Sequence, residues 1–384
     1  MKVSGAFMQT YGTLLLVPLW AGFLMFPFTG SINALGVALA AGGVIVLWKM
    51  TRAGGVVSFF RSAAVRLSGL RPLTDRISSF AKTPPAVAAL LILFILVPYF
   101  QNDYYRDVLT LTGMYAVLAL GLNLVVGQTG LLNLGYVAFY AIGAYTYAIL
   151  STRFGLTFWP GLAAGALSAA ASAAIVGLPT LRLRGDYFAI VTLGLGEITR
   201  IVLNNWDRLT GGPNGIANIR RPVIAGYALS SPLDFYYLIL FLAVLTVLAM
   251  RRLIASRIGR AWIAIREDET AAEAMGINTF KLKLLAFMLG SAWAGGVGVF
   301  FAAKMAFVSP ESFTFFESVM ILCMVVLGGM GSIPGIILGA FLLIALPEVF
   351  REFQDYRMLA FGVALVLMMI FRPQGILGKT TSTK

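Results

Sequence analysis

The sequence has 384 residues, of which 59% are hydrophobic and only 12% are charged, and its formal net charge is +13. Such an apolar chain cannot bury its hydrophobic surface within one water-soluble globule, which excludes an ordinary soluble domain and indicates a membrane protein. The Lys and Arg residues lie in short stretches between apolar runs, so the positive charge indicates loops facing anionic lipid and no nucleic-acid partner.

Residues suited to catalysis and metal binding are scarce. The sequence contains no histidine, and its one cysteine, Cys323, lies in an apolar run. Histidine is the commonest general base and metal ligand, and a single thiol cannot form a disulfide framework. We therefore expect no catalytic site, no cofactor and no metal site, and hence no enzyme.

Apolar runs that could cross a membrane recur along the whole chain. A helix needs about 17 to 25 residues to cross the hydrocarbon layer. Runs near this length cover residues 11–28, 32–48, 84–100, 107–126, 131–150, 158–180, 187–204, 235–250, 283–303, 316–330, 333–350 and 356–371. The sequence thus predicts an all-α polytopic bundle of about 10–12 spanning helices, with residues 316–330 short enough for a partial or re-entrant helix.

Basic residues indicate the orientation of the chain and its division into parts. The segments 49–82 and 251–283 are rich in Lys and Arg, so both are expected on the cytoplasmic side together with the two termini. Arg220 and Arg221 then lie outside, against this bias. We expect residues 1–83 to form extra N-terminal helices with a basic cytoplasmic linker, and residues 84–376 to form the membrane core.

Glycines and amide side chains cluster between the runs 107–126 and 131–150. The turn Gly127-Gln-Thr-Gly130 lies there, and hydrocarbon tolerates amide groups only where they are paired or line a cavity. Tight helix packing through small residues is the alternative explanation. As candidates for the wall of a solute pathway we select Asn123, Gln128, Asn133 and Tyr136.

A second glycine-rich turn, at Gly328-Gly-Met-Gly331, follows a similar pattern of apolar run, turn and apolar helix. Both turns are expected on the same side of the membrane, which is compatible with an internal repeat, a common feature of transporters. Glycine turns unrelated to each other would explain the pattern equally. Gly328 and Gly331 join the pathway candidates.

Glu197 and Arg200 lie three residues apart within the run 187–204, so a helix places them on one face. An unpaired charge at the centre of a membrane helix costs about 2.5–3.5 kcal/mol on insertion scales, which favours a mutual ion pair. This pair could be a structural clamp, a proton relay or a contact for the solute, and Glu197 is the candidate we retain.

The segment 259–278 is too polar to span, yet Trp262, Ile265, Ala272 and Met275 recur at helical spacing and Gly276 supplies a C-terminal stop. A helix lying on lipid would favour a mainly basic face, whereas the mixed charges here favour docking to a protein partner. The candidate contacts are Arg260, Trp262, Arg266, Glu267, Asp268, Glu269, Glu273 and Gly276.

The chain has no ATP-binding site of its own. The closest approach to a phosphate-binding loop is Gly378-Lys-Thr380, but Pro373 occupies the position of the required glycine. Energy for moving a solute must therefore come from an ion gradient or from another subunit. A gradient-driven carrier would show more intramembrane carboxylates than the isolated Glu197.

Several unusual strings occur in one order along nearly the whole chain. They are residues 121–127 (GLNLVVG), 181–194 (LRLRGDYFAIVTLG), 210–215 (TGGPNG), 259–262 (GRAW), 266–269 (REDE), 307–313 (FVSPESF), 326–331 (VLGGMG) and 372–375 (RPQG). With these strings the sequence resembles the LivM-type permeases of branched-chain amino-acid ABC transporters, including their extra N-terminal helices.

The resemblance implies a subunit of a bacterial inner-membrane importer for leucine, isoleucine and valine. It implies a periplasmic binding protein that delivers the substrate, a second permease subunit and two cytoplasmic ATPases. It also implies that the segment 259–278 is the coupling loop that receives the ATPase movement, although only a loose version of the usual loop motif is present. Relatives in the broader family carry urea, short amides or other amino acids.

Two other functions compete with an ATP-driven importer. A gradient-driven secondary carrier is disfavoured by the missing histidines and scarce intramembrane carboxylates, and a scaffold without transport is disfavoured by the glycine turns and clustered amides. We expect alternating access, in which the coupling loop moves the helices around Asn123, Gln128 and the turn from Gly328 to Gly331.

Overall fold

The computed structural model describes residues 94–183, 185–224, 226–349 and 375–376. The chain divides into two units, Met1–Leu91 and Ile92–Lys384, and the described residues all belong to the second. The predicted spans 11–28, 32–48 and 356–371, and most of 84–100, lie outside the described residues. The division at residues 83 and 84 therefore stays a prediction.

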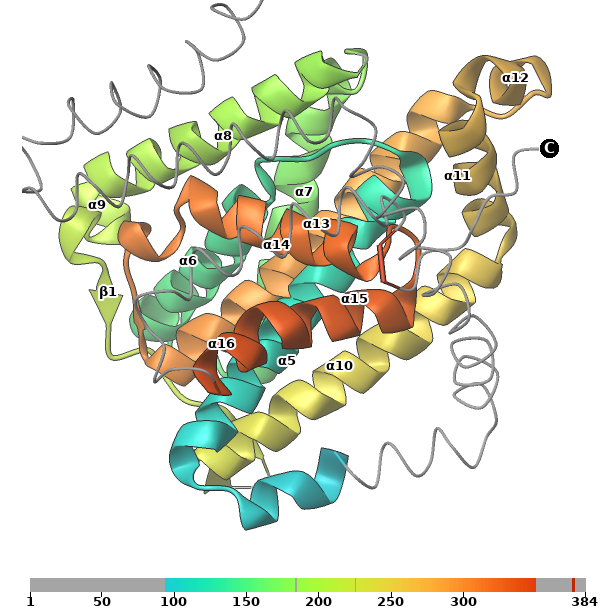
Figure 1. Ribbon diagram of the computed structural model, residues 1–384. Helices are drawn as coiled ribbons and strands as arrows, with labels where there is room; N and C mark the ends of the chain where they lie inside the picture. Colours follow the sequence, from blue (N-terminus) through green and yellow to red (C-terminus); the bar gives the residue numbers. More distant parts are fainter. Residues whose placement is uncertain (1–93, 184, 225, 350–374, 377–384) are drawn as a thin grey trace, which may run out of the picture. The chain divides into compact units, whose positions relative to one another are not determined.

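Helices dominate the described part of the chain (Figure 1). In chain order they are η1 (Val97–Phe100), α5 (Asp103–Asn123), η2 (Leu124–Gln128), α6 (Tyr136–Phe154), α7 (Phe158–Thr180), α8 (Asp186–Asn205), α9 (Asp207–Thr210), η3 (Gly212–Asn214), α10 (Pro232–Ala255), α11 (Arg257–Glu267), α12 (Glu269–Ala274), α13 (Thr279–Met305), η4 (Pro310–Ser312), α14 (Phe315–Gly328), α15 (Ile333–Ala340), η5 (Phe341–Ala345) and α16 (Leu346–Val349). Among the η elements, η2 and η5 are π-helical and the others are 3-10 helices.

The strands are two residues long and form two small antiparallel pairs. β1 (Ile216–Ala217) pairs with β4 (Phe307–Val308), and β2 (Val223–Ile224) pairs with β3 (Tyr227–Ala228). The structure thus confirms the predicted helical bundle, with strands confined to connecting segments.

Five helical segments of the described residues are long and apolar enough to cross a membrane. They are Asp103–Gln128, Phe158–Thr180, Pro232–Ala255, Thr279–Met305 and Pro310–Gly328. α14 itself has only 14 residues and ends at Gly328, before Gly329 with φ +105°, whereas Pro310–Gly328 as a whole is long enough to span, so a partial or re-entrant helix stays a prediction. The predicted single helix over residues 333–350 is interrupted by the π-helix η5.

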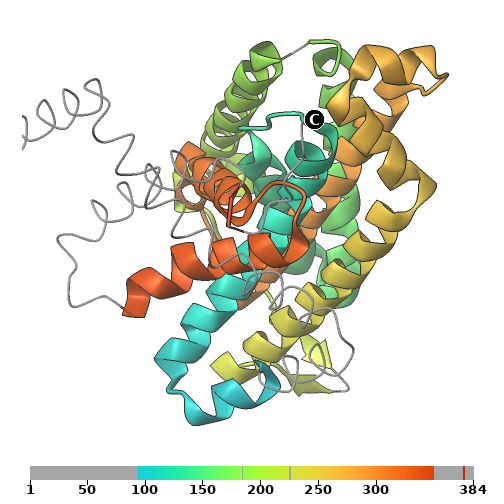
Figure 2. The same ribbon diagram turned by 45° about the vertical axis from the view of Figure 1, so that its right-hand side comes forward.

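Three helices, α6, α7 and α13, pack closely against one another, and α7 is the most exposed of the three (Figures 1 and 2). On α7 a small residue is buried at every fourth position, namely Gly161, Gly165, Ala169, Ala173 and Gly177. Positions four apart lie on one helix face, so α7 presents a smooth groove to its neighbours. Van der Waals contact over this groove stabilises helices in lipid, where the hydrophobic effect between helices is absent.

The closest contacts in this group join glycines of all three helices. A Cβ atom on Gly143 of α6 would overlap the backbone of Gly295 on α13, and a Cβ on Gly295 would overlap the carbonyl oxygen of Gly165 on α7. A side chain at either position would push the helices apart. The packing of the bundle therefore depends on glycines, which have no side chain, at the contact positions as much as on buried side chains elsewhere.

Around this group, α5 packs against α10, α13, α14 and α15, and α8 packs against α6.

The two ends of the bundle differ in their connections. One end holds the turn after η2, the link between α7 and α8, and the helices α11 and α12, and we call it the coupling end. At the opposite end, Tyr147 Oη donates to the carbonyl oxygen of Arg220 over 2.7 Å, and β1 pairs with β4.

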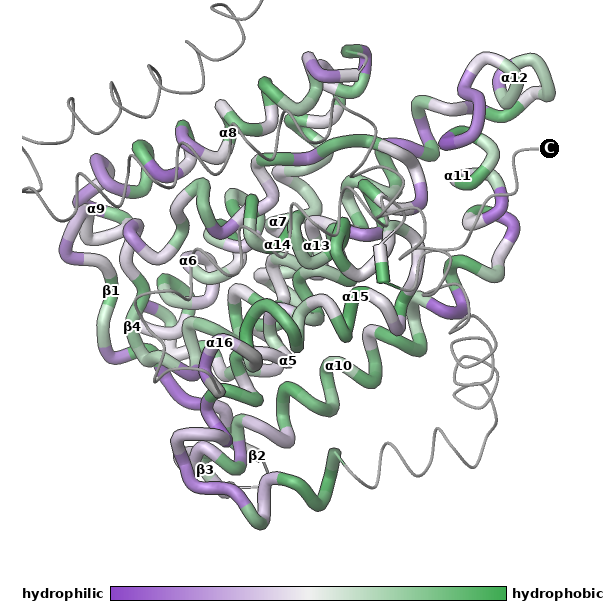
Figure 3. The backbone as a smooth tube through the Cα atoms, viewed as in Figure 1, coloured by the Kyte–Doolittle hydropathy of each residue, from purple (hydrophilic) through white to green (hydrophobic). Residues whose placement is uncertain are grey.

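Hydrophilic residues gather in the segments that join the helices, as Figure 3 shows. Residues 251–283, predicted on the cytoplasmic side, lie at the coupling end. The segments 205–234 and 304–315, which the same topology predicts outside, meet at the opposite end, where Ile216 pairs with Val308 and Ala217 with Phe307. This alternation agrees with successive membrane crossings.

We predict that Gly295→Ala lowers the free energy of unfolding by about 1–3 kcal/mol, because the new methyl group forces the α7 and α13 backbones apart. Gly296→Ala is the matched control, since its Cβ would meet only Leu162 Cδ1 at 3.7 Å, an ordinary contact. Thermal unfolding of the purified protein in detergent checks both variants. Equal stability of the two would contradict the proposed packing.

Candidate translocation and coupling site

The two glycine turns predicted from the sequence touch each other at the coupling end. Asn123, the last residue of α5, is almost fully buried, and its Oδ1 accepts a hydrogen bond from the backbone N–H of Gly331 over 2.8 Å. Gly331 has φ +86° and Gly329 has φ +105°, a conformation that glycine adopts without strain. One amide side chain therefore ties the end of α5 to the turn between α14 and α15.

The backbones of the two turns also approach closely. A Cβ atom on Gly127 would overlap Asn123 Oδ1 and lie 2.7 Å from the backbone nitrogen of Gly331. Gln128, which is 3% exposed, lies beside the same turn. Of the predicted pathway residues, the structure therefore brings together Asn123, Gln128, Gly328 and Gly331 as one junction, which we call the glycine junction.

The coupling loop predicted as one helix consists of two, α11 and α12, separated by Asp268 in an extended conformation. Asp268 begins α12 by accepting a hydrogen bond from the backbone N–H of Ala271. Such capping competes with continuation of the preceding helix, which explains the break. Gly276, with φ +81°, follows α12 as the expected stop.

The apolar stripe of this segment packs inside the chain. Trp262 is fully buried, and its Nε1 donates to the carbonyl oxygen of Leu282 on α13 over 2.8 Å. Ile265 and Ala272 are buried in the same cluster, with Leu124 of η2 and Met250 of α10.

Trp262 therefore holds α11 against the bundle, and the face left open to a partner is mostly polar. Its exposed residues are Arg260, Arg266, Glu267, Asp268, Glu273, Met275 and Gly276, while Glu269 is partly exposed.

Arg266 connects α11 to the glycine junction. Its Nη1 donates to the carbonyl oxygen of Gly127 over 2.6 Å, and its Nη2 lies 3.4 Å from Glu267 Oε1. A Cβ on Gly331 would lie 3.5 Å from the same Nη1. A cation is favourable at the C-terminal end of a helix, where carbonyl groups lack partners within the helix. Arg266 thus bonds to the first turn and lies beside the second.

An ion pair between the buried Lys283 and the partly exposed Glu269 connects α12 to the long helix α13. Lys283 of α13 is 5% exposed, and its Nζ lies 2.5 Å from Glu269 Oε1 at the start of α12. Breaking a buried pair leaves one charge without a partner, so the two helices are held together firmly. With Trp262, this pair fixes the coupling segment to α13.

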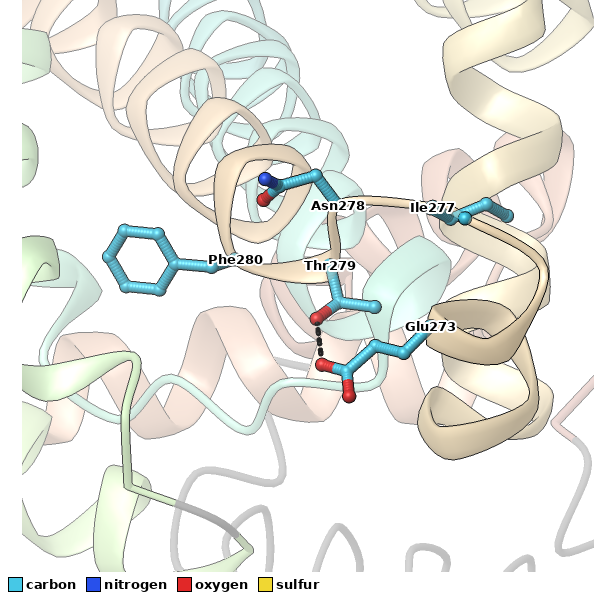
Figure 4. A pocket seen from close by; sticks show the side chains of 6 residues that line it. Glu273, Ile277, Asn278, Thr279 and Phe280 are labelled. Atoms are coloured by element: carbon cyan, nitrogen blue, oxygen red, sulfur yellow. Dashed lines mark hydrogen bonds between the residues drawn. The ribbon is translucent and has the colours of Figure 1, made fainter.

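Two hollows flank the coupling segment. One, of about 260 Å³, is bordered by Thr129 and Gly130, by Leu183 and Gly185, and by the stretch from Ile265 to Glu269 with Lys283. The other, of about 390 Å³, lies at the turn between α12 and α13. Figure 4 shows its lining, in which Thr279 Oγ1 donates to Glu273 Oε1 over 2.6 Å. Both hollows adjoin exposed polar residues of α11 and α12.

Two predicted pathway residues lie away from this junction. Tyr136 is fully buried and its Oη donates to the carbonyl oxygen of Gly290 on α13 over 2.9 Å. Asn133 is fully buried beside it, and its Oδ1 accepts from the backbone N–H of Gly135 over 3.0 Å. Both side chains position the start of α6, and the buried Nδ2 of Asn133 has no hydrogen-bond partner among the described residues. Their role in a pathway stays a prediction.

Glu197 and Arg200 form the predicted ion pair on α8, at 3.2 Å. Arg200 also lies 3.6 Å from Glu311 of η4, and all three side chains are partly or largely exposed. The pair therefore does not face a closed interior of the described bundle. It lies beside the segment that leads into α14.

Two features of the structure were not predicted from the sequence. Lys283 begins the predicted run 283–303 and was given no role, because its contact with Glu269 becomes visible only in the fold. Glu317 was overlooked although it lies in the predicted run 316–330, and its carboxylate accepts a hydrogen bond from Tyr115 Oη on α5. The position of a carboxylate inside an apolar run could have identified Glu317 as a candidate.

Residues 104–371 match the family of permease components of branched-chain amino-acid transport systems. The chain belongs to this family. It is 44% identical over 367 residues to the permease LivM of the high-affinity branched-chain amino-acid transport system of Escherichia coli K12, covering 87% of this chain and 86% of that protein. The chain is thus a multi-pass membrane permease and not an enzyme, as the sequence predicted.

More distant relatives belong to the same family. The permease LivH of the same E. coli system is 28% identical over 73% of this chain and 96% of its own length. A probable LivM of Methanocaldococcus jannaschii is 26% identical over 72% of this chain and 93% of its own length. No solved structure matches the chain.

We predict that Asn123→Leu destabilises the protein by about 1–3 kcal/mol, because the buried N–H of Gly331 loses its acceptor. Asn123→Asp keeps an acceptor at the same place and should retain more of the stability. Asn205→Leu is the control, since Asn205 is exposed at the end of α8. Thermal unfolding in detergent measures all three, and equal effects of Leu at positions 123 and 205 would contradict the role of this bond.

Proposed function

We propose that this chain is the membrane-spanning subunit of an ATP-driven importer of leucine, isoleucine and valine in a bacterial inner membrane. The observation that carries the proposal is the 44% identity to E. coli LivM over 87% of the chain. Because the match covers most of both chains, the substrate and the energy source are expected to be shared. Urea, short amides or other amino acids are the alternative substrates.

A second permease subunit completes the pathway in this proposal. E. coli has two permeases, LivM and LivH, in its high-affinity branched-chain amino-acid system, and both are relatives of this chain. Two related subunits can pack around one passage, with each contributing a wall. We therefore expect a partner of the LivH kind beside this chain.

Two cytoplasmic ATPases supply the energy, and they dock at the coupling end. Exposed charges of both signs on α11 and α12, among them Arg260, Glu267, Asp268 and Glu273, can pair with a protein surface. The hollow of about 390 Å³ beside Glu273 offers a place for a partner side chain. A periplasmic binding protein delivers the amino acid to the opposite end, where β1 and β4 pair.

The contacts at the coupling end suggest how movement passes through the protein. ATP-driven closure of the ATPases displaces α11 and α12. Trp262 and the Lys283–Glu269 pair carry this displacement to α13, and Arg266 carries it to the end of η2 and hence to Asn123 and Gly331. The glycine junction then opens or closes the pathway, as alternating access requires.

We predict ATP-dependent uptake of labelled leucine by proteoliposomes that contain this chain with its second permease, its two ATPases and its binding protein. Uptake should be competed by isoleucine and valine and left unchanged by urea or polar amino acids. Omitting ATP, or any one partner, is the control and should abolish accumulation. Uptake of another solute in place of leucine would disprove the substrate, and accumulation without ATP would favour a gradient-driven carrier.

A further inference from the structure

Glu317 places a carboxylate at the depth of the hydrocarbon layer. It lies in the first turn of α14, within the span Pro310–Gly328, and accepts a hydrogen bond from Tyr115 Oη. Tyr115 is about 18 Å from the start of α5, at 1.5 Å per residue. That is near the middle of the 26-residue helix Asp103–Gln128. The carboxylate therefore lies far from both ends of the bundle.

The carboxylate of Glu317 has no basic partner among the described residues. No Lys or Arg nitrogen of those residues lies within 4.0 Å of its oxygens. Other acids of the described spans do have such a partner: Asp103 pairs with Arg106, Asp107 with Lys304 and Glu311 with Arg200. Asp234 caps the start of α10 at the opposite end. The first turn of α14 favours a negative charge through the helix dipole but does not neutralise it.

The surroundings of Glu317 are open. Glu317 and Tyr115 are each partly exposed, and their neighbours Phe316, Met320 and Leu111 are exposed. Intramembrane charges are found facing water-filled cavities or opposite charges and not lipid tails. A water-filled space or a cation beside this face of α14 and α5 would satisfy the charge of Glu317 in the same way.

We propose that Glu317 lines the translocation pathway and receives the ammonium group of the transported amino acid, with Tyr115 orienting its carboxylate. This inference rests on the proposed function, because leucine, isoleucine and valine all carry an ammonium group when they cross as zwitterions. A charge-assisted hydrogen bond replaces the water that the ammonium loses in the passage. The contact therefore selects for an amino group, and not for a particular side chain.

The position of Glu317 also connects the contact to the coupling end. α14 begins beside Glu317 and ends at Gly328, next to the turn in which Gly331 donates to Asn123. A displacement of the glycine junction along α14 therefore moves the carboxylate relative to Tyr115 on α5. The amino acid would be bound and released as this one helix shifts.

The first test compares rates of ATP-dependent leucine uptake in the reconstituted complex. Glu317→Gln keeps an acceptor for Tyr115 without the charge, and should lower the rate about tenfold or more at unchanged complex yield. Glu317→Asp keeps the charge and should retain most of the rate, while Asp103→Asn, at an exposed ion pair, should leave it unchanged. A wild-type complex that fails to take up leucine contradicts the proposed function, whereas an active Glu317→Gln variant contradicts only this inference.

The second test measures access of water to the site. Glu317→Cys, introduced together with Cys323→Ala, should react with a charged, membrane-impermeant thiol reagent, and loaded binding protein with ATP should slow the reaction. No reaction in an assembled complex means that the side chain is covered by protein or lipid and overturns the proposal. The Glu317→Gln complex could also assemble poorly, while the fraction that does assemble transports at the wild-type rate. That result assigns Glu317 to a structural ion pair and overturns the proposal.

Discussion

The last carbonyl groups of a helix find no partner within that helix, and in a membrane this leaves polar atoms that something else must satisfy. At the end of η2 the carbonyl oxygen of Gly127 is met by the guanidinium group of Arg266, which belongs to a segment 139 residues further along the chain. This bond places the polar coupling segment against the end of a membrane span. The same end carries Asn123, whose side chain satisfies the N–H of Gly331 in the second turn.

These contacts explain why a permease of this kind combines rigid and adaptable parts. The glycine contacts of α6, α7 and α13 bring backbones so close that relative sliding of these helices would create overlap. The helices at the glycine junction are interrupted instead, by the π-helix η2, by the turn after α14 and by the π-helix η5. Interrupted helices can shift at their breaks without unpacking the centre, and they leave backbone groups that line polar spaces.

The parts of the structure that depend on local pattern were predictable from the sequence. The apolar lengths of α7, α8 and α13 gave their positions within a few residues, and the Glu197–Arg200 pair followed from helical spacing. The family resemblance, carried by strings such as VLGGMG, is confirmed by the match over residues 104–371. The two glycine turns were recognised separately, but nothing local shows that they touch.

Contacts between distant segments could not be derived from pattern alone. Trp262 was selected as a contact for a partner, but the fold buries it against α10 and α13. Lys283 became a buried partner of Glu269 only because α12 folds back onto α13. Tyr136 and Asn133 were selected as pathway residues, whereas their hydrogen bonds hold the start of α6 in place. A buried amide or phenol group can either pack helices together or line a pathway, so the residue type alone does not distinguish the two roles.

The central claim is that Arg266 transmits the movement of the coupling segment to the glycine junction. Spin labels at Met330 and Phe154, both exposed, in a Cys323→Ala background report the displacement of the second turn by double electron–electron resonance. In the assembled complex, trapping the ATP-bound state should change this distance by about 2–5 Å, the range of helix shifts in switching proteins. In Arg266→Gln this change in distance should disappear, although the ATPases still bind. The same change in that variant would contradict the role of Arg266.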